Sequence, residues 1–136
     1  MTDHGMQHLP PPAAAGLAAA GIDHVRLAYC YLTARDLDGY LSLLDAEMIL
    51  HRPDGPAVRG RTRIEALRRQ QLQGRSLHFA VSRTYAAGDL VVAVGRYRGD
   101  ALHGTYADAE FCDLFTVGRD GLLLSQKTFF YVTPSA

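Results

Sequence analysis

The 136-residue chain is predicted to fold as one small α+β domain, a curved sheet packed over three helices. Two patterns support this. In the first half, apolar residues recur every three or four positions, as in amphipathic helices. From Ser76 onward, apolar and polar residues alternate, as in half-buried strands. Helices segregated from an antiparallel sheet usually cover one of its faces, so this order indicates a two-layer domain.

Three helices are expected, each with its own start signal. The first begins at Asp23, which can cap a helix, and the second follows the breaker Asp36-Leu37-Asp38-Gly39 and continues through Leu44. The third is expected over 63–73, because 62–65 match a capping box. The first helix carries one apolar stripe, formed by Ile22, Val25, Tyr29 and Leu32.

Turn signals separate the predicted strands. A short strand, 48–52, stops at Pro53-Asp54-Gly55-Pro56. Four later strands can pair as a meander, and Arg119-Asp120-Gly121 supplies the last hairpin turn. Their predicted ranges are 77–85, 90–98, 105–117 and 122–132.

Charge and composition narrow the choice of partners. Fourteen basic and fourteen acidic residues cancel, so no long-range field attracts nucleic acid or an anionic membrane. Residues 1–12 lack the basic region of a secretion signal, and 13–20 are too weakly apolar to span a bilayer. We expect a cytoplasmic protein with a flexible leader over 1–21, a domain over 22–132 and a tail over 133–136.

Cysteines and histidines give few signals of a special site. Cys30 and Cys112 lie far apart in apolar segments, which favours buried, reduced thiols over a disulfide. His51, His78 and His103 are possible proton carriers, although His51 should face away from the pocket side. No pair shows the close spacing of zinc ligands, so no metal site is expected.

The order of elements resembles the nuclear transport factor 2-like superfamily, over 22–132. The matching pieces are Asp36-Leu37-Asp38-Gly39, the strand that ends near Pro53, Val58-Arg59-Gly60-Arg61 before the third helix, and Phe111-Cys112-Asp113-Leu114-Phe115 before an Asp-Gly turn. Within the superfamily, the chain looks most like SnoaL-like polyketide cyclases and ketosteroid isomerase. The resemblance implies a cone-shaped antiparallel or mixed sheet, closed by the helices around a deep apolar pocket, and a homodimer through the outer sheet face. Activities vary widely on this fold.

Asp113 is the first candidate for catalysis. Strand alternation places it on one face with Phe111 and Phe115, so a carboxyl group would stand between two rings. Such burial raises the pKa of a carboxyl group. The resemblance implies the general base of the cyclases, or the protonated Asp of the isomerase oxyanion hole. The alternative is a surface Asp paired with Lys127 or Arg119.

Arg52 and Tyr29 are further catalytic candidates. Ungapped alignment places Arg52 where the isomerase has its proton-shuttling Asp, and arginine cannot act as that base. Arg52 could instead hold a carboxylate or enolate oxygen, or simply reach solvent or pair with Asp54. The isomerase tyrosine falls on Ala28, so Tyr29 joins the site only if the helix register differs. Otherwise Tyr29 is a core residue.

The last strand offers candidates for substrate binding. Gln126, Thr128 and Phe130 form one alternating set, and the resemblance favours this set as pocket lining. The alternative is a polar sheet edge. Leu50, on the strand that leads to Arg52, is expected to line the same pocket.

These residues lead to one main functional hypothesis. It is a cofactor-free acid/base enzyme of the cyclase, isomerase or dehydratase type, acting on a small apolar carbonyl compound such as a polyketide-like metabolite. One alternative is a non-catalytic binding protein for a hydrophobic metabolite. Another is a dimeric interaction module whose pocket is filled by side chains. No nucleic acid or membrane partner is expected.

Overall fold

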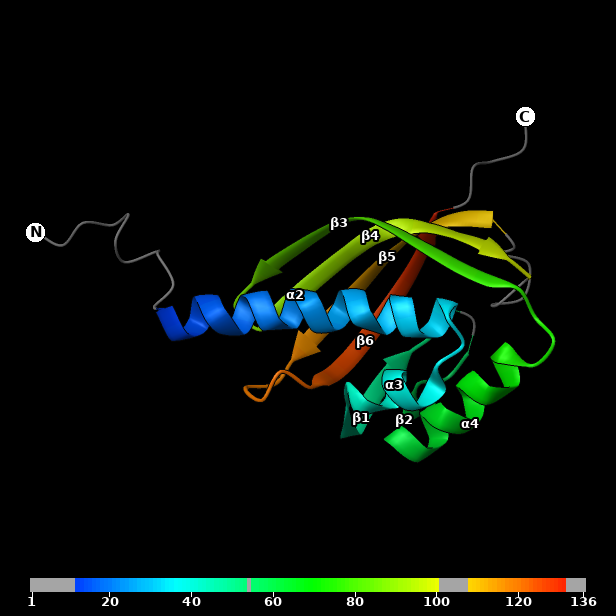
Figure 1. Cartoon of the computed structure of the whole chain (residues 1–136), viewed down its shortest axis with the longest axis horizontal. Coiled ribbons are helices and arrows are strands. Elements are labelled where there is room, and N and C mark those ends of the chain that lie inside the picture. The colour runs from blue at the N-terminus through cyan, green and yellow to red at the C-terminus, as the bar shows by residue number, and fades with distance from the viewer. Residues whose placement is uncertain (1–11, 54, 101–107, 132–136) are drawn as a thin grey trace, which may run out of the picture.

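The computed structural model describes residues 12–53, 55–100 and 108–131. These residues form three helices and a six-stranded mixed sheet that is not closed. Helix α2 (Pro12–Thr33) runs along one face of the sheet, and α3 (Leu37–Ser42) and α4 (Arg61–Leu72) lie together near one end of it (Figure 1). The predicted α+β fold is confirmed. The elements are α2 (Pro12–Thr33), α3 (Leu37–Ser42), β1 (Leu44–His51), β2 (Val58–Arg59), α4 (Arg61–Leu72), β3 (Leu77–Ala87), β4 (Leu90–Gly99), β5 (Asp108–Val117) and β6 (Leu123–Tyr131).

Helix α2 begins at Pro12, eleven residues before the predicted cap at Asp23. Proline suits the first helical position, and the alanines that follow have the highest helix propensity of all residues. Residues 12–21, which the sequence assigned to the leader, are therefore helical, whereas 1–11 lie outside the described residues. The predicted apolar stripe does face the sheet, because Val25, Tyr29 and Leu32 are buried.

The starts of α3 and α4 follow different rules. Asp36 caps α3 as expected, since its Oδ1 accepts from the backbone N–H of Gly39 at 2.9 Å. The predicted capping box of α4 is wrong. The helix starts two residues earlier than expected, with Gly60 as its N-cap and no side-chain cap. The N–H of Gly60 donates to the carbonyl of Met48 at 2.7 Å, which ties the helix start to β1.

The sheet has the strand order β2-β1-β6-β5-β4-β3. The meander from β3 to β6 is antiparallel, as predicted, and Gly118 and Leu122 are bonded across the last turn at 2.8 Å. β1 starts at Leu44, earlier than predicted, because Leu43 already accepts from Leu123 of β6 at 2.9 Å. β1 runs parallel to β6 and places Leu50 opposite Gln126. The short strand β2 was not predicted.

Gly95 on β4 allows an unusually close approach of its neighbours. It pairs with Val81 on one side, next to a register shift in β3, and with Phe111 on the other. A Cβ atom here would lie 2.2 Å from the carbonyl oxygen of Ala80 and 2.9 Å from the Phe111 ring. The absence of a side chain therefore lets the Phe111 ring lie across β4.

Several surface features bear on the expectations from sequence. Cys112 is half-buried, but Cys30 is exposed, so its predicted burial is wrong. Cys30 follows Tyr29 on α2, and one residue turns a side chain about 100° around a helix, away from the core.

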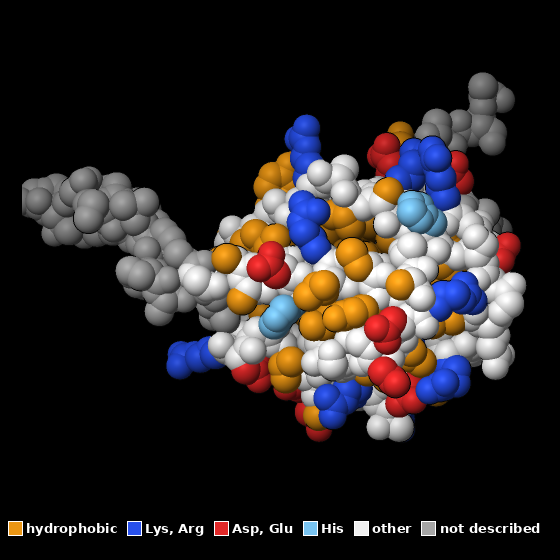
Figure 2. Space-filling model, in the orientation of Figure 1, with side chains coloured by type: hydrophobic (Ala, Val, Ile, Leu, Met, Phe, Trp, Pro, Cys, Tyr) orange, Lys and Arg blue, Asp and Glu red, His pale blue; other side chains and the backbone are white. Residues whose placement is uncertain are grey.

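Acidic and basic side chains are mixed on the face that carries α2, in keeping with the formal net charge of zero (Figure 2).

The described part of the chain shows neither a candidate membrane span nor a candidate metal cluster. None of its helices combines the length and the apolar character that a membrane span requires. Its His, Cys, Asp and Glu side chains form no cluster of three or more that could hold a metal ion.

Candidate functional site

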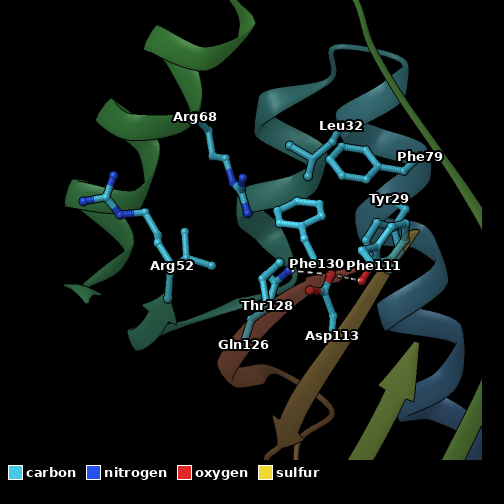
Figure 3. A pocket seen from close by; sticks show the side chains of 11 residues that line it. Tyr29, Leu32, Arg52, Arg68, Phe79, Phe111, Asp113, Gln126, Thr128 and Phe130 are labelled. Carbon is cyan, nitrogen blue, oxygen red and sulfur yellow. Dashed lines mark hydrogen bonds between the residues drawn. The ribbon is translucent and has the colours of Figure 1, made fainter. Parts of the chain in front are cut away.

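A narrow cavity lies between the sheet and the helices α2 and α4. Its free space is about 410 Å³ including the mouth, but only about 20 Å³ is wide enough for a water molecule. That is room for roughly one water, so a ring-sized ligand must displace side chains. Eleven residues, ten from six elements and Arg52 from the loop after β1, line the cavity (Figure 3): Tyr29, Leu32, Leu50, Arg52, Arg68, Phe79, Phe111, Asp113, Gln126, Thr128 and Phe130.

Asp113 is buried at the floor of this cavity, with 2% of its surface exposed. Its Oδ2 accepts from the Tyr29 hydroxyl and, at 3.0 Å, from Nε2 of Gln126, whereas Oδ1 has no hydrogen-bond partner among the described residues. Burial raises the pKa of Asp113, although Thr128, Tyr29, Gln126 and the charge of Arg68 act to lower it. The surface ion pair considered from sequence is not formed.

Tyr29 serves both roles that the sequence left open. Its ring packs in the core against Phe79 and Phe111, each at 5.5 Å between ring centroids, and against the edge of Phe115. Its hydroxyl reaches Asp113 (Figure 3). Burial and the charge of Asp113 raise the pKa of Tyr29 well above its ordinary value. Tyr29 therefore remains a proton donor to Oδ2.

Arg68, like Phe79, is a residue of the cavity that the sequence did not single out. It is 5% exposed, on α4, and its Nε donates to the Tyr40 hydroxyl at 3.2 Å while Nη1 donates to Oε1 of Gln71 at 2.9 Å. Its spacing was a usable signal. Arg68 is one turn after the buried Ile64, and Gln71 follows at the next helical step, so all three share the buried face of α4.

Arg52 lines the cavity but is oriented differently from Arg68. Its Nε donates to the carbonyl of Pro56 at 3.2 Å, and its guanidinium points away from Asp113 while that of Arg68 points inward (Figure 3). Arg52 also borders an outer groove with His51 and Lys127. Its charge therefore lies at the mouth of the cavity.

The other predicted residues fall into two groups. The structure brings Leu50, Phe111, Gln126, Thr128 and Phe130 into the cavity wall, whereas Phe115 lies behind it and packs on Tyr29. His51 and His78 are exposed and do not line the cavity, and His103 lies outside the described residues.

The sequence and the fold both match known proteins. The family model for the SnoaL-like domain matches residues 25–126. The chain belongs to the SnoaL-like family. The resemblance drawn from the motif order is thereby confirmed, with the nuclear transport factor 2-like cone as its fold. No curated protein matches the chain.

Solved structures with this fold include enzymes of more than one kind. An epoxide hydrolase-like protein from Mycobacterium tuberculosis superimposes with a TM-score of 0.73 at 19% identity, covering 84% of each chain. A proposed polyketide cyclase from Sinorhizobium meliloti gives 0.70 at 14% identity, covering 79% of this chain and 94% of its own. TerC, crystallised with polyporic acid, gives 0.68 at 22% identity, covering 82% and 92%. At these identities, the similarity establishes the fold of the SnoaL-like chain but not its activity, which has to be inferred from the geometry of the site.

Proposed function

We propose that this SnoaL-like protein is a cofactor-free acid/base enzyme that moves a proton on a small, largely apolar carbonyl compound. The observation that carries the proposal is the asymmetric setting of Asp113. Tyr29 and Gln126 hold Oδ2, while Oδ1 has no partner among the described residues. A carboxyl group fixed through one oxygen can present the other in a constant direction. Its raised pKa suits proton transfer at working pH.

The chemistry follows from that geometry. Oδ1 of Asp113 takes a proton from the carbon next to the substrate carbonyl, and the electron pair of the broken C–H bond forms an enolate. The enolate can then regain the proton from Asp113 at another carbon. It can instead attack a second carbonyl group to close a ring, whose alkoxide takes the proton from Asp113, or expel a β-hydroxyl that receives this proton and leaves as water. These outcomes correspond to an isomerase, a cyclase and a dehydratase, and all begin with the same proton transfer.

The surroundings support this proposal. Phe79, Phe111 and Phe130 contribute aromatic walls, which suit an apolar substrate, and desolvation strengthens electrostatic interactions within the cavity. A proposed polyketide cyclase and an epoxide hydrolase-like protein share the fold, which favours a catalytic role and polyketide-like substrates.

Exchange of α-protons for deuterium tests the proposal with 2-tetralone, an apolar bicyclic ketone. We expect the protein to accelerate this exchange, with a rate that saturates as the ketone concentration rises, as measured by proton NMR in D₂O. The Asp113→Asn variant should lower the exchange rate by about 100-fold or more. Asp89→Asn, at an exposed turn, is the matched control and should keep the full rate. Binding of 2-tetralone without faster exchange would contradict the enzyme and favour the non-catalytic binding protein.

The homodimer implied by the resemblance belongs to the same proposal. Phe129 and Tyr131 on β6 are 47% and 61% exposed, which supports contact through this sheet face. Light scattering should give a particle mass twice that of one chain, and the Phe129→Asp variant should have the mass of a single chain. Leu27→Asp, an exposed position on α2, is the control that should remain dimeric. A monomeric parent protein contradicts this part of the proposal.

A further inference from the structure

Arg68 is a buried cation whose hydrogen-bond partners among the described residues are neutral. Its guanidinium donates to the hydroxyl of Tyr40 and the amide oxygen of Gln71, and it lies 5.3 Å from the centroid of the Tyr40 ring. Within the described ranges, no carboxylate oxygen lies within 4.0 Å of its nitrogens. A guanidinium keeps its charge in proteins, and burying a charge is costly unless an opposite charge compensates it.

The cavity as a whole is more positive than the protein around it. The chain has a formal net charge of zero. Among the described residues that line the cavity, Arg52 and Arg68 are cationic and Asp113 is the one acidic residue. Together with its mouth, where the Arg52 charge lies, the cavity therefore carries two positive charges against at most one negative charge, whether or not Asp113 is ionised. Such a site favours an anionic ligand over a neutral ligand of the same shape.

The third nitrogen of the guanidinium is available for a ligand. Nε and Nη1 are each used once, and Nη2 has no hydrogen-bond partner in the part of the chain that the structure describes. Tyr40 and Gln71 hold the guanidinium plane from α3 and α4, and Figure 3 shows it reaching inward above Gln126 and Thr128. Arginine recognises carboxylates through donors in one plane.

We propose that Arg68 binds a carboxylate group of the ligand, so that the substrate is an apolar carbonyl compound that carries one carboxylate. The identity of the carbonyl part rests on the proposed function, but binding of the carboxylate does not. Arg68 thus supplies orientation from the helix side of the cavity, opposite the proton-transferring Asp113 on the sheet. Tyr40 and Gln71 are positioning residues for Arg68.

A matched pair of probes tests the proposal without turnover. Calorimetric titration of the wild-type protein should give 2-naphthoate at least tenfold tighter binding than 2-naphthamide, which has the same rings and no charge. The Arg68→Gln variant should bind naphthoate at least tenfold more weakly than the wild-type protein does, and its affinity for the amide should change little. Arg69→Gln, whose side chain points outward to Glu65 at 2.6 Å, should retain the preference. Equal affinity of the wild-type protein for both probes overturns the proposal.

A second readout covers the case in which Arg68→Gln does not fold. Arg68→Lys keeps the charge but loses the planar fork, and thermal unfolding shows whether each variant is folded. In the wild-type protein, the Nε–H NMR signal of Arg68 should shift on addition of naphthoate and stay unchanged with the amide. If naphthoate binds and the Nε–H signal of Arg68 does not shift, Arg68 has a purely structural role.

The two proposals fail in different ways. Asp113→Asn removes the proton carrier but leaves Arg68, so it should bind naphthoate at least as tightly as the wild-type protein while losing tetralone exchange. Naphthoate preference without tetralone exchange in the wild-type protein would refute only the proposed enzyme. Exchange without naphthoate preference would refute only the role of Arg68.

Discussion

The hydroxyl of Tyr29, on α2, donates to Oδ2 of Asp113, on β5, although the two residues are 84 positions apart in the chain. This contact joins the helix layer to the sheet at the floor of the cavity. It also lowers the pKa of Asp113, in opposition to the larger effect of burial. The balance of these two effects sets the proton affinity of the carboxyl group.

Tyr29→Phe tests that balance, because phenylalanine keeps the ring contacts and removes the donor. We expect the pKa of Asp113 to rise further and the unfolding free energy to fall by about 1–3 kcal/mol, as for loss of a buried hydrogen bond to a charged group. Carboxyl-carbon NMR measures the pKa, with Asp113→Asn assigning the signal. An unchanged or lower pKa would show that the hydroxyl does not stabilise the carboxylate.

The stability of the protein should depend on pH through Asp113. Burial raises its pKa above the ordinary value of 3.8, so the folded chain binds this proton more tightly than the unfolded chain does. The stabilisation is full below the unfolded pKa and is lost as the pH rises through the folded pKa. Asp113→Asn has no such proton. Its unfolding free energy relative to wild type should therefore increase over this window, by about 1.4 kcal/mol for each unit of pKa shift.

Urea unfolding of both proteins from pH 4 to pH 8 measures this difference, because contributions from the other ionisable groups cancel between them. A difference that stays constant with pH, or that falls as the pH rises, would mean that the pKa of Asp113 is not raised in the folded protein.

Gly95→Ala should damage both the sheet and the cavity. Its Cβ would meet the carbonyl oxygen of Ala80 at 2.2 Å and the Phe111 ring at 2.9 Å, and the backbone oxygen cannot move away as a flexible side chain would. We expect the unfolding free energy of Gly95→Ala to be lower than that of the wild-type protein by about 2–4 kcal/mol. Gly16→Ala is the control. It lies exposed in α2 with no atom within 4 Å of an added Cβ, and should gain up to about 1 kcal/mol. Thermal unfolding compares the two, and an equal response would refute the packing explanation.

The two cysteines should differ in reactivity. Cys30 is exposed, whereas burial and the nearby Asp113 charge raise the pKa of the Cys112 thiol. Because the thiolate is the reactive form, Cys30 should react faster with a disulfide reagent at neutral pH, roughly tenfold or more. Cys30→Ala should remove the fast phase in a spectrophotometric assay, and Cys112→Ala should leave it. A fast phase that survives in Cys30→Ala would contradict the exposure of Cys30.

Strand alternation was sufficient to predict much of the site. A period of two puts Phe111 and Asp113 on one face of β5, and Gln126, Thr128 and Phe130 on one face of β6. Apart from the irregular pairing near Val117, the two strands are in register along this region, and Asp113 pairs with Thr128. The sequence pattern is sufficient here because successive residues of a strand point to opposite faces of the sheet, so no further information is needed to assign each residue to a face.

The helix contributions were harder to predict, for two physical reasons. A side chain on a helix reaches a site only if its register and the helix position are both known, which is why Tyr29 could be assigned to the core but not to Asp113. Arg68 was missed because arginine on an amphipathic helix usually lies in solvent. Only its step from Ile64 indicated a buried position. The boundaries of α2 and α4 differ from the predicted ones because alanine propensity and a glycine cap, and not capping side chains, set them.

The parallel pairing of β1 with β6 has a consequence for how the protein folds. Leu50 pairs with Gln126, so β1, which also pairs with the nearby β2, gains its second partner only when the last strand is present. A chain emerging from the ribosome can form the β3–β4–β5 part of the meander and its local helices beforehand. The wall made by Gln126, Thr128 and Phe130 must wait. Contacts between distant parts of a chain form slowly, so closure of the sheet around the cavity should be a late step in folding. A chain cut before β6 would keep Asp113 and Arg68 but have no cavity to hold them in place.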